Sequence, residues 1–265
     1  MTQPALSRAI RALEDAAGTA LFVRSPQGAE LTEAGRLLSG DARSLVKLAS
    51  AALTRAGRLS RDDEGPRVTA RGCDVDVLAW LVDSYNERYP DERPARAAMV
   101  DWRVQGDQVR AGETDVTLMR SPFDRYGLDS DLLRADPRVA LLPETHPMTG
   151  REVVHRSELA GETFPVWPDL TPAETAFWTG TDLTYYSWRP GPVVHDAAQF
   201  VGSIRLGQAI GFIAEAHLPE QLPGGVGVVP VTGLTPSELR ITWASTATSP
   251  DIARFVRHAT EVTAA

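Results

Sequence analysis

Apolar residues near the start of the chain recur at helical spacing. Leu6, Ile10, Leu13 and Ala17 follow one another at intervals of four, three and four residues, which predicts an amphipathic helix over residues 2–17. Thr2 provides an N-cap, and proline is tolerated in the first turn, where its missing N–H is not needed. The opposite face is polar and carries Gln3, Ser7, Arg8 and Arg11. Such groups can bind base edges and phosphates, although this helix alone is more simply interpreted as an ordinary surface helix.

Two short strands and a long helix are predicted next. After Gly18, an apolar segment over residues 21–24, a Pro/Gly turn over 25–30 and a second short segment predict a two-stranded wing. Thr32 is then the expected N-cap of a helix that runs to about residue 61. A heptad seam follows this helix, made of Leu38, Ala42, Leu45, Ala49, Ala52, Ala56 and Leu59. A narrow apolar stripe on so long a helix favours pairing with a second copy, the alternative being packing on its own domain.

The rest of the chain alternates between strand and helix patterns. Residues 68–70, 97–100, 116–119, 132–133 and 139–142 read as strands, with helices over 74–89 and 103–111 between them. A second run follows, with strands at 164–167, 193–194, 210–213, 226–231 and 239–244 and helices over 172–178, 197–206 and 250–262. This order predicts parallel-dominated sheets with helices on both faces.

The first 35 residues resemble the winged helix-turn-helix of LysR-type transcriptional regulators. The resemblance rests on Q-P-A-L-S-x-x-I-x-x-L-E, G-x-x-L-F-x-R and L-T-x-A-G, in this order and spacing. Residues 109–116, 141–147 and 207–213 are similar to phrases of the same family's effector-binding domain. In that family about two further helices precede this point. The resemblance therefore implies either a true start roughly 30 residues upstream or a form that dimerises without binding DNA well.

The resemblance implies an α+β multidomain fold. It consists of a partial winged helix-turn-helix over 1–35, a dimerisation linker helix over 36–64, and a two-lobed α/β effector domain over 66–265, built like a periplasmic binding protein. Lobe I is expected at 66–144 and 229–265 and lobe II at 145–228, with crossings near Leu142–His146 and Gly227–Pro230. The expected DNA contacts are Gln3, Pro4, Ser7, Arg8, Arg11 and Arg24, and the expected partners are promoter DNA, a small-molecule effector and further copies, as a dimer or tetramer.

Candidate effector contacts lie at strand ends and helix starts. They are Gly72, Cys73, Asp74, Arg120, Ser121, Asp196, Gln199, Phe200, Phe212 and Ile213. The loop before the helix at 74 can offer N–H groups to an anion, whereas a carboxylate at Asp74 discourages an acidic effector or caps the helix. Arg120 suits an acidic ligand, but a salt bridge to a nearby acid explains it equally well.

Charge is unevenly distributed along the chain. The whole chain has a net charge of −8, whereas residues 1–61 carry nine basic and five acidic groups, leaving the remainder at −12. A basic N-terminal segment followed by an acidic remainder is typical of a polyanion-binding module joined to a domain that does not bind DNA.

Several classes of protein are disfavoured. There is no run of 18 apolar residues and no secretory signal pattern, so we expect a cytoplasmic protein without a membrane partner. The single cysteine, Cys73, allows no internal disulfide or multi-thiolate metal site, although its place at a helix start could lower its thiol pKa.

Metal and enzyme sites are also not expected. His146 beside Pro147 is expected to be structural, and the other histidines, at 155, 195, 217 and 258, lack metal-ligand spacing. No enzyme motif is present, and we expect neither an enzyme nor a cofactor. The sequence predicts a DNA-binding transcriptional regulator that responds to a small molecule. The alternative is a ligand-binding, oligomerising module that has lost DNA binding.

Overall fold

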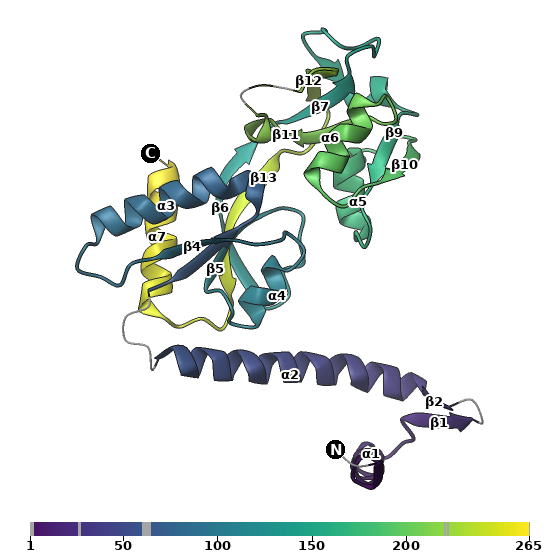
Figure 1. Ribbon diagram of the computed structural model, residues 1–265, viewed down its shortest axis with the longest axis vertical. Helices are drawn as coiled ribbons and strands as arrows, with labels where there is room; N and C mark the ends of the chain where they lie inside the picture. Colours follow the sequence, from purple (N-terminus) through teal and green to yellow (C-terminus); the bar gives the residue numbers. More distant parts are fainter. Residues whose placement is uncertain (1–2, 26–27, 60–64, 220, 222, 265) are drawn as a thin grey trace. The chain divides into compact units, whose positions relative to one another are not determined.

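The computed structural model describes residues 3–25, 28–59, 65–219, 221 and 223–264 (Figure 1). The chain divides into two compact units, one formed mainly by Met1–Asp62 and one by most of the remainder. Among the helices in these residues, none is long and apolar enough to cross a membrane.

The N-terminal unit is a helix, a two-stranded wing and a long helix. Helix α1 is Gln3–Ala17, strands β1 (Phe22–Ser25) and β2 (Gly28–Leu31) pair antiparallel, and α2 is Glu33–Leu59. These elements confirm the pattern predicted from the sequence. Thr2, the predicted N-cap of α1, lies outside the described residues.

Local contacts explain how the wing joins α2. The Oγ1 of Thr32 accepts a hydrogen bond from the Gly35 N–H at 2.9 Å, which is the predicted N-cap, and donates to the Ala20 carbonyl at 2.8 Å. Leu21 is buried, and its carbonyl lies so close to Gly35 that a Cβ at this position would overlap the carbonyl oxygen. Gly35 is therefore required by close backbone approach.

The first sheet of the larger unit has the order β4-β3-β5-β13-β6. Its strands are β3 (Arg67–Ala70), β4 (Arg96–Met99), β5 (Val116–Arg120), β6 (Leu128–Asp136) and β13 (Ser237–Ala244). Strands β4, β3 and β5 are parallel, whereas β13 is antiparallel to both β5 and β6. The sheet is therefore mixed, rather than parallel-dominated as predicted.

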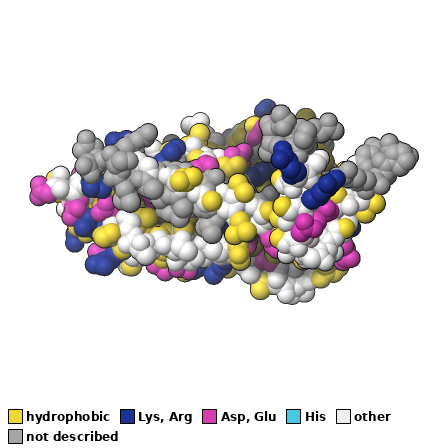
Figure 2. Space-filling model, turned by 90° about the horizontal axis from the view of Figure 1, so that it is seen from below, with side chains coloured by type: hydrophobic (Ala, Val, Ile, Leu, Met, Phe, Trp, Pro, Cys, Tyr) yellow, Lys and Arg dark blue, Asp and Glu magenta, His cyan; other side chains and the backbone are white. Residues whose placement is uncertain are grey.

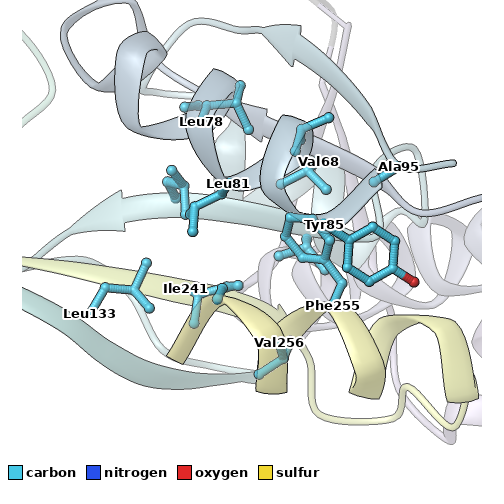
Figure 3. Close-up of a cluster of buried hydrophobic side chains, with 14 of the residues drawn as sticks. Val68, Leu78, Leu81, Tyr85, Ala95, Leu133, Ile241, Phe255 and Val256 are labelled. Atoms are coloured by element: carbon cyan, nitrogen blue, oxygen red, sulfur yellow. The ribbon is translucent and has the colours of Figure 1, made fainter. Parts of the chain in front are cut away.

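Helices cover both faces of this sheet. Helices α3 (Val75–Arg88) and α7 (Pro250–Ala264) pack on one face, where Leu81, Tyr85 and Phe255 meet Val68 and Ile241 (Figure 3). In helix α4 (Gln105–Arg110), the side-chain amide of Gln105 donates a hydrogen bond to the Thr117 hydroxyl. The neighbours of Thr117 on β5, Val116 and Leu118, belong to the core that α3 and α7 cover. Since side chains alternate along a strand, α4 lies on the opposite face.

The second sheet of the larger unit has the order β11-β7-β12-β8. Its strands are β7 (Arg138–Pro143), β8 (Val154–His155), β11 (Gly211–Ala214) and β12 (Val226–Thr232). Ala140 and Leu142 of β7 face one core and Leu141 faces another, so both faces of the strand are buried. Around this sheet lie β9 (Thr163–Val166), β10 (Arg189–Val193), α5 (Pro172–Thr179) and α6 (Ala197–Arg205).

The chain leaves the first sheet earlier in the sequence than predicted, and it returns to that sheet later than predicted. Strand β7 pairs with β11 and β12, and the whole of β12 stays in the second sheet. The crossings are therefore at Pro137 and at residues 233–236, not near Leu142–His146 and Gly227–Pro230. The limits between the lobes, which were predicted at 144/145 and 228/229, therefore move to these two crossings. An apolar segment shows that a strand is buried, but its sheet is decided by hydrogen-bond partners distant in the chain.

Candidate functional site

Helix α1 carries the predicted DNA-contacting face. Arg8 and Arg11 are exposed, and Ser7 is partly buried. Gln3 and Pro4 belong to α1 and Arg24 to β1, but their side chains lie outside the described part of the chain. On the apolar side of α1, Leu6 and Leu13 are 46% and 49% exposed, so the apolar stripe of this helix is only partly covered by the rest of the chain.

Helix α2 presents an apolar surface. On the predicted seam, Leu38 is partly buried and Ala42, Leu45 and Ala49 are exposed; Ala52, Ala56 and Leu59 lie in α2 with side chains outside the described set. The helix also exposes Leu37, Val46 and Leu53. Exposed apolar side chains at several places on one face of the protein can be seen in Figure 2. A seam of this kind suits a partner helix.

Asp74 is the centre of a buried ionic network in the larger unit. It follows β3 in a single 3₁₀ turn (Gly72–Asp74) and is 1% exposed. Its Oδ2 lies 2.9 Å from the Arg71 Nε, and its Oδ1 accepts from the Arg120 Nε at 2.9 Å and from the His217 ring at 3.0 Å. Asp74 occupies the N-cap position of α3, as the sequence suggested, but its side chain makes no cap bond to this helix and instead belongs to the ionic network.

Arg120 connects Asp74 to both crossings. Its Nη1 donates to the Asp136 carboxylate at 2.6 Å, at the end of β6, and to the Ser237 carbonyl at 3.2 Å, at the start of β13. The Arg120 side chain is 3% exposed. Of the two interpretations of Arg120 from the sequence, the structure shows the salt bridge.

Burial and charge act against each other on the pKa values of this cluster. Burial alone would raise the Asp74 pKa, but the His217 hydrogen bond and the charges of Arg71 and Arg120 hold this pKa well below its usual range. Burial lowers the pKa of His217, with Asp74 opposing. A neutral His217 ring then donates its Nε2 proton, because a carboxylate only accepts.

Cys73 differs from the expectation for a helix start. Desolvation of its thiol raises its pKa, although the residue is exposed overall. The expected lowering of this pKa is wrong, because partial desolvation outweighs the nearby positive charges. The Sγ atom lies 3.8 Å from Oδ2 of Asp74.

The structure brings together only part of the predicted effector set. Gly72, Cys73 and Asp74 are consecutive, Asp74 bonds Arg120, and Ser121 follows with a buried Oγ for which no hydrogen-bond partner is found among the described residues.

The remaining predicted residues serve their own elements. Asp196 accepts from the Gln199 N–H at 2.7 Å as the N-cap of α6, and Gln199 accepts from the His195 N–H at 2.8 Å. Phe200 and Phe212 are buried in two different apolar clusters, and Ile213 packs against the cluster that contains Phe200.

Sequence reasoning missed His217 and Asp136. His217 ends a 3₁₀ turn (Glu215–His217) after β11 and is 143 residues from Asp74, so no local motif links them. A second network at the crossings was also missed. Arg138 donates to the Thr235 carbonyl at 2.6 Å and to both oxygens of Asp182 at 2.8 and 2.9 Å. As predicted, His146 has a structural part, accepting from the Met148 N–H at 3.2 Å.

Two family models match the chain. The model described as LysR substrate binding domain matches residues 74–264, and the bacterial regulatory helix-turn-helix protein, lysR family, matches residues 1–36. Together with a two-lobed α/β unit that follows a helix, a wing and a linker helix, these matches define the class. The chain belongs to the LysR family.

Curated relatives align with part of their length. The Hca operon transcriptional activator HcaR of Escherichia coli (strain K12) is 30% identical over 164 residues, which cover 62% of this chain and 55% of that protein. The HTH-type transcriptional regulator ShiR of Corynebacterium glutamicum (strain R) is 31% identical over 174 residues, covering 64% and 58%. The chain thus spans little more than half the length of these relatives.

Solved structures share the fold. Full-length CbnR complexed with its target DNA superposes with a TM-score of 0.58 and 20% identity, covering 99% of this chain and 91% of that chain. The BenM effector-binding domain with its effector benzoate gives a TM-score of 0.59 and 17% identity over 76% of this chain and 93% of that one.

Proposed function

We propose that this protein is a DNA-binding transcriptional regulator whose larger unit responds to a small molecule held between its two lobes. The observation that carries the proposal is the order of parts: a helix with an exposed polar face, a wing and a linker helix precede a two-lobed α/β unit. The DNA and effector in the names of similar structures support it.

DNA recognition is assigned to α1. Ser7 and Arg8, with Gln3 and Pro4, would contact base edges, and Arg11 and Arg24 would contact phosphates. Ser, Gln and Arg supply the donors and acceptors that distinguish base pairs in the major groove. Helix α2 would pair two protomers, so that two copies of α1 bind two half-sites.

Effector response is assigned to the Asp74 network. Gly72, Cys73, Asp74, Arg120 and Ser121 lie around the loop before α3, and His217 reaches Asp74 from the second lobe. A ligand that binds here more tightly in one arrangement of the lobes than in another would shift the population toward that arrangement. The proposal does not rest on Phe200 or Phe212, which are buried in apolar clusters.

A second function remains open because of the apolar side of α1. Leu6 and Leu13 of this helix are about half exposed, so much of its apolar side is left uncovered by the described residues. This favours a ligand-binding, oligomerising module without DNA binding.

Selection from a random duplex library decides between the two functions. Immobilised full chain is cycled with random double-stranded DNA, and the retained sequences are counted. A regulator enriches a two-fold symmetric site, because paired protomers present two copies of α1. Arg8→Ala is expected to lose this enrichment, whereas Arg257→Ala, which removes an exposed arginine of α7, keeps it. No enrichment by the parent chain would support the oligomerising module instead.

A further inference from the structure

We infer that Cys73, Asp74 and His217 form a binding site for a divalent transition-metal ion that bridges the two lobes. Each residue offers one ligand atom, and the three atoms lie within 4.8 Å of one another. Two of these residues precede α3 beside the first sheet, and His217 follows β11 of the second sheet.

The chemistry of the donors selects the class of ion. A thiolate, a carboxylate and an imidazole together suit Zn²⁺ and its neighbours in the first transition row, and do not suit Mg²⁺ or Ca²⁺. Three protein ligands with a fourth position left for water form the open kind of zinc site.

The three ligand atoms lie within 4.8 Å of one another and must move closer together to bind an ion. Around a tetrahedral ion with ordinary bond lengths, ligand atoms lie roughly 3.4–3.6 Å apart. The Cys73 Sγ is 3.8 Å from Oδ2 of Asp74, and the His217 Nε2 is 3.0 Å from Oδ1 of the same carboxylate. The two oxygens belong to one planar group, so His217 shifts from Oδ1 to an ion held at Oδ2.

The arginines decide which oxygen is available. Arg120 is buried and tied to Asp136 and Ser237, so it stays on Oδ1 and orients the ligating carboxylate. Arg71 lies on Oδ2, and its side chain is 18% exposed, so it can move into water.

The charge of the cluster balances when Arg71 leaves. The ion brings two positive charges, and the cluster gives up one with Arg71 and one with the thiol proton of Cys73. That proton passes to solvent as the sulfur–metal bond forms, and nothing is oxidised or reduced. The Nε2 proton of the neutral His217 ring moves through solvent to Nδ1, so that the Nε2 lone pair binds the ion and the charge of the ring does not change. Asp74 and Asp136 then remain balanced by the ion, the thiolate and Arg120.

This inference deepens the proposed function in one respect, because an ion that joins the lobes would be the effector, and that step rests on the proposed function. Binding of the ion does not. It is tested without DNA.

The test titrates Co²⁺ into metal-free full-length chain and follows the absorption spectrum. The expected result is one ion per chain, with a near-ultraviolet sulfur-to-cobalt band and visible bands of a four-coordinate ion. Cys73→Ser removes the sulfur band, and His217→Gln weakens binding at least about tenfold. His195→Gln, an exposed histidine beside α6, leaves both unchanged.

Arg71→Gln separates this proposal from a general loss of charge. Because Arg71 competes with the ion for Oδ2, its removal is expected to leave Co²⁺ affinity equal or tighter. Absence of the sulfur band in the parent chain, its persistence in Cys73→Ser, or loss of binding in Arg71→Gln would each overturn the site. Cys73 is exposed, so the serine variant is expected to fold; circular dichroism checks all variants.

The two proposals fail in different ways. If Co²⁺ binds but Zn²⁺ does not change the affinity for a selected DNA site, the metal site stands and its role as effector falls. If no DNA is selected at all, the absorption experiment is unaffected.

Discussion

Arg120 illustrates how a buried charge depends on its partners. Its guanidinium lies between Asp74 and Asp136, and replacing it removes the buried cation that these two carboxylates share. We expect Arg120→Met to destabilise the larger unit by about 3–5 kcal/mol. Urea denaturation followed by tryptophan fluorescence measures this, since all six tryptophans lie after residue 64.

The matched control for Arg120 is Arg134. It contacts the same Asp136 at 2.8 Å, but its side chain is 44% exposed. Arg134→Met is expected to cost about 1 kcal/mol or less, because water solvates the charge it leaves behind. Equal losses of stability for the two variants would mean that burial does not determine how strongly each arginine stabilises the fold.

His258 provides a pH-dependent term in stability. It is 1% exposed, its ring lies 2.9 Å from the Ser84 Oγ, and burial together with Arg88 lowers its pKa, while Glu261 opposes. The folded state therefore binds fewer protons than the unfolded chain, whose histidine titrates near pH ~6.5. Stability from this group is present above that pH and is lost as the pH falls through it.

The variant His258→Gln isolates this term. Unfolding free energies of parent and variant, measured at pH 7.5 and 5.5, are expected to show a smaller loss on acidification in the variant. His195→Gln, at an exposed position, should lose as much as the parent. The same loss in all three proteins would mean that His258 does not contribute.

At the scale of single residues, local sequence predicted what local geometry decides. Thr32 as an N-cap follows from the residues after it, whereas for Arg120 the sequence left an acidic ligand and a salt bridge as equal alternatives, and the structure shows the salt bridge. His217 at Asp74 could not be found, because the contact depends on how two sheets with distant strands are connected. For the same reason, Asp182 and Thr235 could not be found as partners of Arg138.

At the scale of elements, periodicity predicted most helices and strands to within a few residues. Apolar runs mark buried strands, and helical spacing marks amphipathic helices, because each pattern reflects which side faces the core. The direction and sheet of a strand are not in that pattern. Strand β7 was therefore recognised but placed in the wrong lobe, and β13 was recognised without its antiparallel neighbours.

Helix α2 is the element whose role can be tested alone. Leu45 is 65% exposed on the predicted seam, so Leu45→Glu would place a charge against a partner helix. We expect the dissociation constant for self-association to rise at least about tenfold, which is a cost of about 1.4 kcal/mol. Sedimentation velocity over a concentration series measures it.

Arg36→Glu is the control for the seam. Arg36 is exposed in the first turn of α2 and, at 100° per residue, lies far around the helix from Leu45. It also introduces a glutamate, so a general effect of charge would appear in both variants. An unchanged mass for Leu45→Glu would remove α2 as the pairing surface.

At the scale of the whole molecule, charge separates the two parts of the chain. Residues 1–61 carry a net charge of +4 and the remainder −12. Binding of basic side chains to phosphates releases counterions, whereas acidic surfaces repel DNA. We therefore expect the N-terminal unit alone to make the contacts that give the affinity for DNA. The salt dependence of DNA binding then counts the contacts made by that unit.

Arg11→Ala tests this count. Arg11 is exposed on α1 and is proposed to bind a phosphate, so its loss should weaken binding to all DNA sequences about equally. The slope of log K against log salt is expected to become shallower by about 1. Arg257→Ala removes the same charge from the acidic unit and should leave the slope unchanged. If both substitutions changed the slope equally, the acidic unit would also contact the DNA, and the inference that only the N-terminal unit binds phosphates would be wrong.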